Sequence, residues 1–238
     1  MALALAVGLG VPLAALAAPL PPHDSEAQRV LAKASPAVRA LDARVRERSD
    51  NGGRPFAILD KAQARLYVYD PNGRLQGAAP VLLGLARGDD SVPGIGERPI
   101  AKVRPFERTT PAGRFDAKPG RNANGEDVVW VDYDAAVSMH RMRAIDPTEH
   151  RPQRLATPSP ADNRISFGCI NLPPAFFDHV LRPLFTRGGQ PGGVVYVLPE
   201  TRPLQAQFAA LFETPRAGSG AAAIDARSAA RLQLARRS

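Results

Sequence analysis

Cys169, the single cysteine of the 238-residue chain, lies in a Ser-Phe-Gly-Cys-Ile-Asn segment at positions 166–171. A thiol with a pKa of about 8.5 is mostly protonated at neutral pH, so a nucleophilic cysteine needs a basic or cationic neighbour. Gly168 leaves room for an approaching carbonyl and allows backbone amides to face a developing oxyanion. The pattern predicts an acyl-transfer site with Cys169 as the nucleophile. The alternative is a small buried side chain with an inert thiol.

The chain contains four histidines that differ in their expected setting. His23 falls in a link near the N-terminus, and His179 belongs to a helix surface. His140 is expected at the end of a long strand, which holds a side chain rigidly, whereas His150 falls in a loop rich in proline. We therefore expect His140 to be the base for Cys169, with His150 as the alternative. The spacing of these residues matches no common zinc finger or ribbon, so no metal is expected.

Short strands separated by turns are expected to position these residues. The 24 Pro and 20 Gly indicate many turns, and a mainly β fold with a few helices fits best. The strand at 128–139 is expected to be central and to place His140 at its end, and the strand at 194–198 is expected to close an antiparallel sheet. Runs of β-branched and aromatic residues bounded by turn residues predict the strands, which lie at 56–59, 65–69, 81–85, 113–115, 128–139, 165–170 and 194–198.

Helices are expected at three places. Ser25 can cap a packing helix that runs to about Arg48 with an interruption at Pro36. A second helix follows Pro173 and its neighbouring proline, and a short one lies around 205–212. The Pro-interrupted segment from 143 to 163 predicts a long irregular loop, which in compact domains is commonly a lid or binding segment.

The N-terminus predicts export. Residues 1–18 carry no charge and end in Ala-Leu-Ala, the small-x-small pattern that signal peptidase accepts. The alternative is a buried apolar helix. No later stretch approaches the roughly 20 apolar residues that span a bilayer, so no transmembrane segment is expected after removal of the leader. The expected location is the periplasm or cell envelope. Disulfides form in such oxidising compartments, but a single cysteine cannot form one within the chain.

The net charge of +8 bears on the choice of partner. The basic residues are scattered and form no aromatic-interleaved stripe or groove-binding helix, so nucleic acid is not expected as a partner. An anionic polymer outside the cytoplasm suits this charge better. We expect a monomer organised as a signal peptide (1–18), a linker with a packing helix (19–54), one catalytic domain (55–200), and a helix with a flexible tail (201–238).

The ordered set of motifs resembles the L,D-transpeptidase catalytic domain family of bacterial cell-wall enzymes. The resemblance rests on a strand-end histidine at His140, the Ser-Phe-Gly-Cys-Ile-Asn segment, the opening strands at 56–60 and 66–69, and the Thr-Pro-Ala-Gly turn at 110–113. It covers 56–199 and implies an L,D-transpeptidase-like antiparallel β-sandwich or barrel. Three differences stand out: Arg141 where the family has Gly, Phe167 where it often has His, and a separation of 29 positions between His140 and Cys169, which implies an insertion at 143–163.

The resemblance implies a transferase that acts in cell-wall biogenesis and cell shape. Cys169 would attack a peptidoglycan stem peptide with His140 as base, release D-Ala, hold a thioester, and pass the acyl group to an amine of a second stem, without a cofactor. Water as acceptor would instead give an L,D-carboxypeptidase or an amidase that releases wall proteins. A cell-wall-binding module that has lost catalysis is a second alternative.

The expected roles of the surrounding residues complete the site. The amides of Gly168 and Cys169 would hold the oxyanion, and Ser166 and Asn171 would shape the cysteine loop. Asn171, Arg164 and Arg141 are the candidate substrate-binding residues, because an arginine fork suits a stem-peptide carboxylate. The alternative for each arginine is a solvated surface position.

Overall fold

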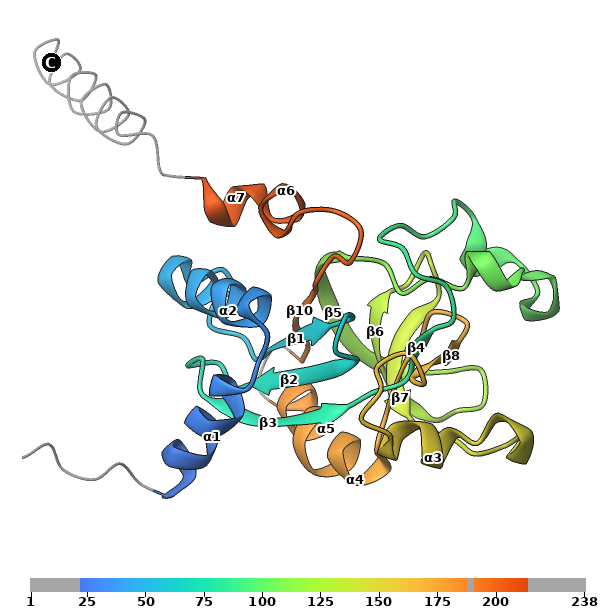
Figure 1. Ribbon diagram of the computed structural model, residues 1–238, viewed down its shortest axis with the longest axis horizontal. Coiled ribbons are helices and arrows are strands. Elements are labelled where there is room, and N and C mark those ends of the chain that lie inside the picture. The colour runs from blue at the N-terminus through green and yellow to red at the C-terminus, as the bar shows by residue number, and fades with distance from the viewer. Residues whose placement is uncertain (1–21, 188–190, 214–238) are drawn as a thin grey trace, which may run out of the picture.

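A ten-stranded framework carries the fold in this computed structural model, which describes residues 22–187 and 191–213 (Figure 1). The mainly β prediction is confirmed. The expected signal peptide and the tail after 213 lie outside the described residues. The strands are β1 (Phe56–Asp60), β2 (Arg65–Tyr69), β3 (Leu75–Pro80), β4 (Leu83–Gly84), β5 (Gly113–Arg121), β6 (Asp127–Asp132), β7 (Val137–Arg141), β8 (Arg164–Ser166), β9 (Ile170–Leu172) and β10 (Gly193–Val197).

Eight of the strands form one mixed sheet in the order β3-β2-β1-β10-β5-β6-β7-β9, and β4 pairs with β8. A bridge between Leu82, just after β3, and Asn171 in β9 brings the two edges together, so the sheet is a nearly closed barrel. The expectation of an antiparallel sheet needs correction, because β1 with β10, β7 with β9, and β4 with β8 are parallel. These partners are joined by long connections instead of hairpins, which permits parallel pairing.

β10 lies between β1 and β5 in the middle of the sheet, where the sequence predicted a closing strand. All five of its residues are buried, as expected of an apolar strand that is covered on both faces. The predicted single strand at 128–139 is also wrong, since β6 and β7 form a hairpin through residues 133–136. Asp132 accepts a hydrogen bond from the Ala135 N–H at 3.0 Å, and Ala136 has a φ of +54°. This turn contains no glycine or proline, which explains why the pattern hid it.

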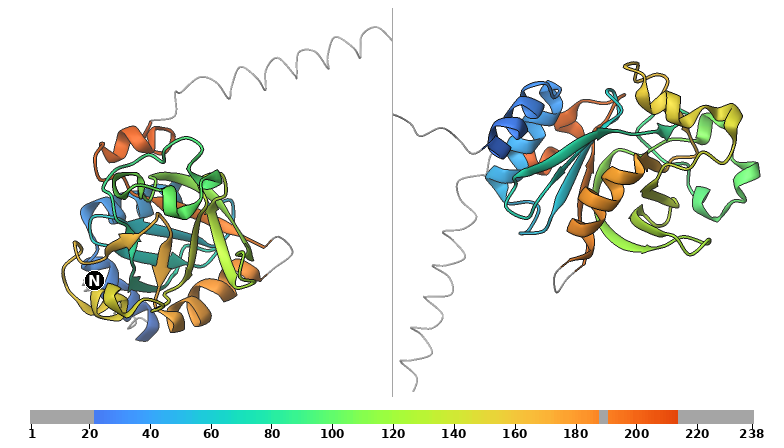
Figure 2. Two further views of the ribbon diagram at one scale, coloured as in Figure 1. Left: turned by 90° about the vertical axis from the view of Figure 1, so that its right-hand side faces the viewer. Right: turned by 90° about the horizontal axis from the view of Figure 1, so that it is seen from below.

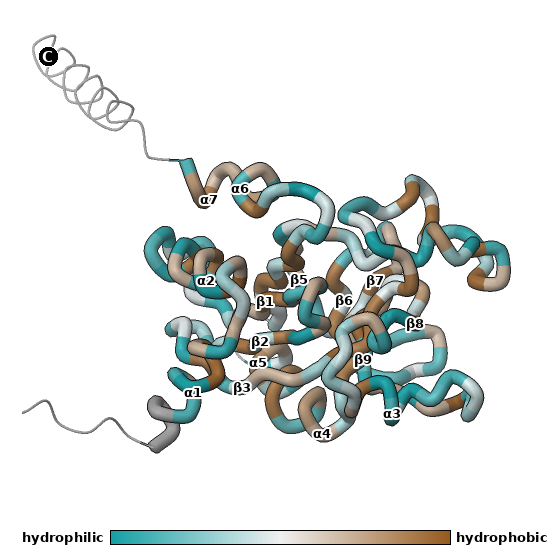
Figure 3. The backbone as a smooth tube through the Cα atoms, in the orientation of Figure 1, coloured by the Kyte–Doolittle hydropathy of each residue, from teal (hydrophilic) through white to brown (hydrophobic). Residues whose placement is uncertain are grey.

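Two hydrophobic clusters lie on opposite faces of β1, β2 and β10. Along β1, Ala57 and Leu59 belong to the cluster inside the barrel, whereas Phe56 and Ile58 belong to the outer one. The inner cluster includes Phe177 and other residues of a helical segment made of α4 (Pro174–Phe176), a π-helical turn (Phe177–Leu181) and α5 (Arg182–Thr186). Figure 3 shows the hydrophobic colour along β1 and a hydrophilic α3 (Arg151–Ala156).

The outer cluster is covered by helices from both ends of the chain, namely α1 (Pro22–Ala32), α2 (Pro36–Arg48), α6 (Leu204–Gln207) and α7 (Ala209–Phe212) (Figure 2). The expected helix from Ser25 is thus two helices, and Ser25 lies within the first. The second begins at Pro36, where the hydroxyl of Ser35 accepts from the Val38 N–H at 3.2 Å. In the described part of the chain, no helix is long and apolar enough to span a bilayer.

Candidate active site

Cys169 lies in a tight loop between β8 and β9 and is partly exposed. The Ser166 hydroxyl donates to the Cys169 carbonyl oxygen at 2.6 Å and accepts from the Gly168 N–H at 3.1 Å. Gly168 has a φ of +130°, and a Cβ there would lie 2.9 Å from the carbonyl oxygen of Thr109. A backbone oxygen has no room to move aside, so the loop requires glycine at this position. Ser166 and Gly168 therefore shape the loop that presents the thiol.

Thr110 holds the same loop from the interior. Its buried hydroxyl donates to the Gly168 carbonyl oxygen at 2.8 Å and accepts from the Gly84 N–H at 3.0 Å. In a planar trans peptide the C=O and the next N–H point in opposite directions, so the Cys169 N–H points away from Thr110. Within 22–187 and 191–213 this N–H has no hydrogen-bond acceptor. It is the backbone donor that stands open beside the sulfur.

The expectation of two oxyanion amides needs correction at Gly168. Its N–H already donates to the Ser166 hydroxyl, so it is not available to a substrate oxygen in this arrangement. Sequence patterns do not reveal this hydrogen bond, because it depends on the loop conformation that turns the Gly168 N–H toward the Ser166 hydroxyl. Cys169 N–H is the donor that remains for the oxyanion role.

Strand β7 lines one side of the sulfur. Ser138 and His140 are two positions apart, so both side chains project from the same face of the strand. The Ser138 hydroxyl lies 3.7 Å from the Cys169 sulfur, which also lies 3.5 Å from the Ala136 carbonyl oxygen. Sequence reasoning missed Ser138, although its position two residues before the chosen histidine was a usable signal.

His140 is oriented by two neighbours. Its Nδ1 lies 2.8 Å from the carbonyl oxygen of Arg141, which only accepts, so Nδ1 carries the proton in the neutral ring. The remaining Nε2 lies 3.4 Å from the side-chain nitrogen of Asn171, which donates to the Cys169 carbonyl oxygen at 3.2 Å. Asn171 thus spans the histidine and the cysteine loop. Its side chain is 1% exposed, so it acts as a positioning residue in this arrangement.

The cysteine and the histidine change each other's ionisation. Burial acts to raise the pKa of the Cys169 thiol, but interaction with the His140 imidazole, with help from Ser138, holds that pKa below its ordinary value. Burial acts to lower the pKa of His140, but the thiol and the Arg141 carbonyl raise it above its ordinary value. Both directions favour a thiolate beside an imidazolium, which is the nucleophilic form of a cysteine.

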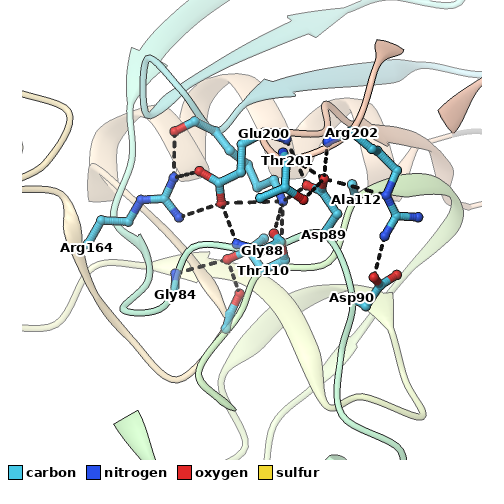
Figure 4. Close-up of polar contacts among 12 residues, drawn as sticks. Gly84, Gly88, Asp89, Asp90, Thr110, Ala112, Arg164, Glu200, Thr201 and Arg202 are labelled. Atoms are coloured by element: carbon cyan, nitrogen blue, oxygen red, sulfur yellow. Dashed lines mark hydrogen bonds and ion pairs between the residues drawn. The ribbon is translucent and has the colours of Figure 1, made fainter. Parts of the chain in front are cut away.

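Arg164 lies away from this pair, in a group we call the buried charge cluster: Lys61, Asp89, Arg164 and Glu200 (Figure 4). Its guanidinium binds Glu200 at 2.6 Å and the Lys61 carbonyl oxygen at 3.0 Å, and its side chain is 8% exposed. The Lys61 ammonium binds Asp89 at 2.8 Å and the carbonyl oxygen of Thr110 at 3.0 Å. The substrate-binding expectation for Arg164 is therefore replaced by a structural role, because its fork is already occupied by an internal carboxylate.

Arg141 is also paired internally. Its guanidinium binds Asp178 of the π-helical turn at 2.6 Å and lies over the Phe177 ring at 4.6 Å from the centroid. This contact anchors the residue whose carbonyl orients His140. Arg141 is thus placed to position the histidine, and its fork is not directed at a free carboxylate. Phe167, the other departure beside the cysteine, stacks under Arg108 at 3.8 Å.

His150 and His179 lie apart from the cysteine and His140. His150 is exposed at the start of α3 with a φ of +49°, and His179 lines a separate cleft with Gln76 and Val180. Neither contributes to the interactions described for Cys169. Among the residues placed by the structure, no three histidine, cysteine or acidic side chains gather as a metal site would require.

No family model matches this chain. No curated protein matches it either. Among solved structures, the chain is similar to the L,D-transpeptidase LdtMt1 in complex with imipenem, at 17% sequence identity and a TM-score of 0.32, covering 60% of this chain and 58% of that one. The chain thus spans less than two thirds of that structure's length.

Proposed function

We propose that the protein is a cysteine acyltransferase of the L,D-transpeptidase type that acts on peptidoglycan stem peptides. One observation carries the proposal: Asn171 links the Cys169 carbonyl oxygen to Nε2 of His140, whose Nδ1 is fixed by a backbone carbonyl, and the partly exposed thiol of this loop lies beside an open backbone N–H. Nucleophile, base and oxyanion donor are the three groups that acyl transfer needs. The sequence motifs supply the substrate class.

The first half-reaction forms the acyl-enzyme. The Cys169 thiolate attacks the carbonyl of the diamino acid L-centre, and the Cys169 N–H stabilises the oxyanion. The C–S bond forms as the C–N bond to terminal D-Ala breaks, and protonated His140 gives its proton to the leaving amine. Because the thioester retains the acyl-transfer potential of the peptide bond, the step needs no other energy source.

The second half-reaction regenerates the enzyme. An amine of a second stem attacks the thioester carbonyl, His140 takes the proton from the attacking nitrogen, and the C–S bond breaks to return the Cys169 thiolate. The product is a cross-link between two diamino acid residues. With water in place of the amine, the same site gives an L,D-carboxypeptidase or an amidase that releases wall proteins. The proposal places this chemistry in the cell envelope, after export directed by residues 1–18.

Muropeptide product analysis tests the reaction. Wild-type protein is incubated with tetrapeptide muropeptides, and the products are separated and weighed. Dimers with loss of D-Ala are the expected result. Tripeptide alone would assign water as acceptor and reject transpeptidation. Cys169→Ala, which removes little volume, is expected to fold normally and form neither product.

A second measurement separates an enzyme from a binding module. Intact mass after incubation with a carbapenem is expected to show one adduct on the wild type and none on Cys169→Ala. A wild-type protein that binds purified cell wall but forms no adduct and no muropeptide product would establish the non-catalytic alternative.

A further inference from the structure

The insertion between His140 and Cys169 places a positively charged side chain, that of Arg151, next to the site. Arg151 is the first residue of α3, and its Nη1 donates to the side-chain oxygen of Asn171 at 2.7 Å. The same Asn171 side chain donates to the Cys169 carbonyl oxygen and faces Nε2 of His140 at 3.4 Å. One amide side chain therefore separates the Arg151 guanidinium from the cysteine and histidine. In keeping with this, the charge of Arg151 is among the influences on the pKa of His140, which it acts to lower.

Arg151 also has N–H groups that make no hydrogen bond within the described ranges of the chain. A guanidinium has five N–H groups. The hydrogen bonds of Arg151 use Nε, which binds Glu149 at 2.5 Å, and one N–H of Nη1. Across the described ranges of the chain, its other N–H groups have no partner. The Arg151 side chain is 15% exposed and that of Glu149 is 28% exposed, so an incoming anion can compete with this ion pair.

The other arginines expected at the site differ in this respect. Arg164 and Arg141 each hold an internal carboxylate, Glu200 and Asp178 respectively. Arg154, on the same helix as Arg151, binds the carbonyl oxygens of Glu149 and Asp162 at 2.8 and 2.9 Å. Arg154 therefore braces the insertion without touching Asn171, and Arg151 is the one of these four that reaches the cysteine loop with open donors.

We propose that Arg151 binds the C-terminal carboxylate of the acyl-donor peptide beside Cys169. This inference rests on the proposed function, in which the attacked carbonyl lies one residue before that carboxylate. Successive residues are about 3.8 Å apart, so the carboxylate falls within the reach of a side chain that adjoins the loop. The guanidinium fork accommodates both carboxylate oxygens. The insertion thereby supplies the specificity that the sequence assigned to Arg164 and Arg141.

Alkylation of the thiol tests the charge without relying on peptide turnover. Iodoacetate and iodoacetamide react with the same thiolate and differ in the carboxylate, so the ratio of their rates cancels any change in thiolate fraction. We expect Arg151→Gln to lower the iodoacetate-to-iodoacetamide ratio by about fivefold at low salt, the effect of one partly exposed charge contact. Arg151→Lys is expected to retain most of the ratio.

Arg154→Gln is the matched control, because it removes an arginine of the same helix that supports the same insertion. Its ratio is expected to equal that of the wild type. An unchanged ratio in Arg151→Gln would overturn the proposal, since it would show that the charge of Arg151 does not act on the anionic reagent. An equal fall in Arg154→Gln would also overturn it, since it would show that distortion of the insertion causes the fall.

Peptide kinetics then locate the carboxylate. Acylation of Cys169 is measured with a stem tetrapeptide and with the same peptide carrying a C-terminal amide. The wild type is expected to prefer the acid by about tenfold or more in kcat/KM, and Arg151→Gln is expected to lose that preference. An undiminished preference in Arg151→Gln contradicts the inference. Failure of both peptides to acylate the wild type contradicts the proposed function instead, while the alkylation ratio still decides the role of Arg151.

Discussion

Two polar clusters adjoin the cysteine loop and are built in opposite ways. In the buried charge cluster, the side chains of Lys61 and Asp89 are 0% exposed, and those of Arg164 and Glu200 are 8% and 4% exposed. Each charge there has opposite charges and backbone groups as partners. The cysteine cluster, which comprises Cys169, His140, Asn171 and Arg151, has a partly exposed sulfur and leaves the Cys169 N–H and part of the Arg151 fork open.

The difference separates polar groups that make the fold rigid from polar groups that are available to a ligand. A fully satisfied buried network fixes the segments that meet in it, and an unsatisfied donor beside a nucleophile is available to a substrate. Thr110 touches both clusters, because its carbonyl oxygen accepts from Lys61 and its hydroxyl donates to Gly168. The closed cluster thus supports the backbone of the open one, and mutations in the two should separate stability from activity.

Replacement of the histidine should give the largest effect on activity. We expect His140→Ala to slow acylation of Cys169 by roughly 10²- to 10⁴-fold, because the proposed general acid and base is lost. The His140 interaction that holds the thiol pKa low is also lost, while burial continues to raise it, so the pH at which iodoacetamide alkylation reaches half its maximum should move upward. Stopped-flow acylation and an alkylation pH profile measure the two effects, and the midpoint of urea unfolding should stay near that of the wild type.

His150→Asn is the control for this prediction. Asparagine tolerates the left-handed backbone conformation found at position 150, so the variant changes the imidazole and little else. Its acylation rate is expected to match the wild type. A larger loss in His150→Asn than in His140→Ala would reverse the assignment of the base.

Removal of the buried lysine should instead act on stability. Lys61→Met removes the buried cation that binds Asp89 and leaves that carboxylate with only the partly exposed Arg202 as a cationic partner, so we expect the free energy of unfolding to fall by about 3–5 kcal/mol at pH 7. Burial acts to raise the pKa of Asp89, but hydrogen bonds from Lys61, Thr201 and backbone N–H groups hold it well below its ordinary value. The contribution of Asp89 is therefore present above the unfolded pKa of about 3.9 and is lost as the pH falls toward the folded one. Urea unfolding at several pH values should show the gap to wild type narrowing on acidification.

The matched control lies at the exposed end of the same network. Arg202 pairs with Asp89 at 3.6 Å and with Asp90, and its side chain is 37% exposed. Exposed ion pairs contribute about 0–1 kcal/mol, so Arg202→Gln should shift the unfolding midpoint only slightly. Equal losses of unfolding free energy in Lys61→Met and Arg202→Gln would mean that the buried and the exposed ion pairs contribute equally to stability.

The contrast between the clusters also explains what the sequence could and could not predict. The pairing of Cys169 with His140 and the opening strands could be predicted from the sequence, because residue type and period-2 patterning are local signals. The hairpin at 133–136 was missed for lack of glycine or proline, and the position of β10 depends on a parallel pairing with β1 across most of the chain. The roles of Arg164 and Arg151 depend on which carboxylate or amide each meets after folding, which the sequence order of either residue does not specify.

Thr110, which joins the clusters, is expected to give a smaller effect on activity than His140 and a smaller effect on stability than Lys61. Thr110→Val keeps the shape of the side chain but removes the hydroxyl, and leaves the Gly168 carbonyl and the Gly84 N–H without their partner. We expect a loss of about 1–3 kcal/mol in the free energy of unfolding, measured by urea denaturation. Acylation of Cys169 by peptide should also slow by about tenfold, because the peptide group that carries the Cys169 N–H is no longer held.

The two thiol reactions separate these consequences. Alkylation by iodoacetamide displaces iodide at a saturated carbon and forms no oxyanion, so Thr110→Val should leave its rate nearly unchanged while peptide acylation falls. Thr110→Ser retains the hydroxyl and should restore acylation toward the wild-type rate. If alkylation and acylation fell together in Thr110→Val and serine restored neither, the threonine would act on the thiol itself, and the Cys169 N–H would lose its place as the oxyanion donor.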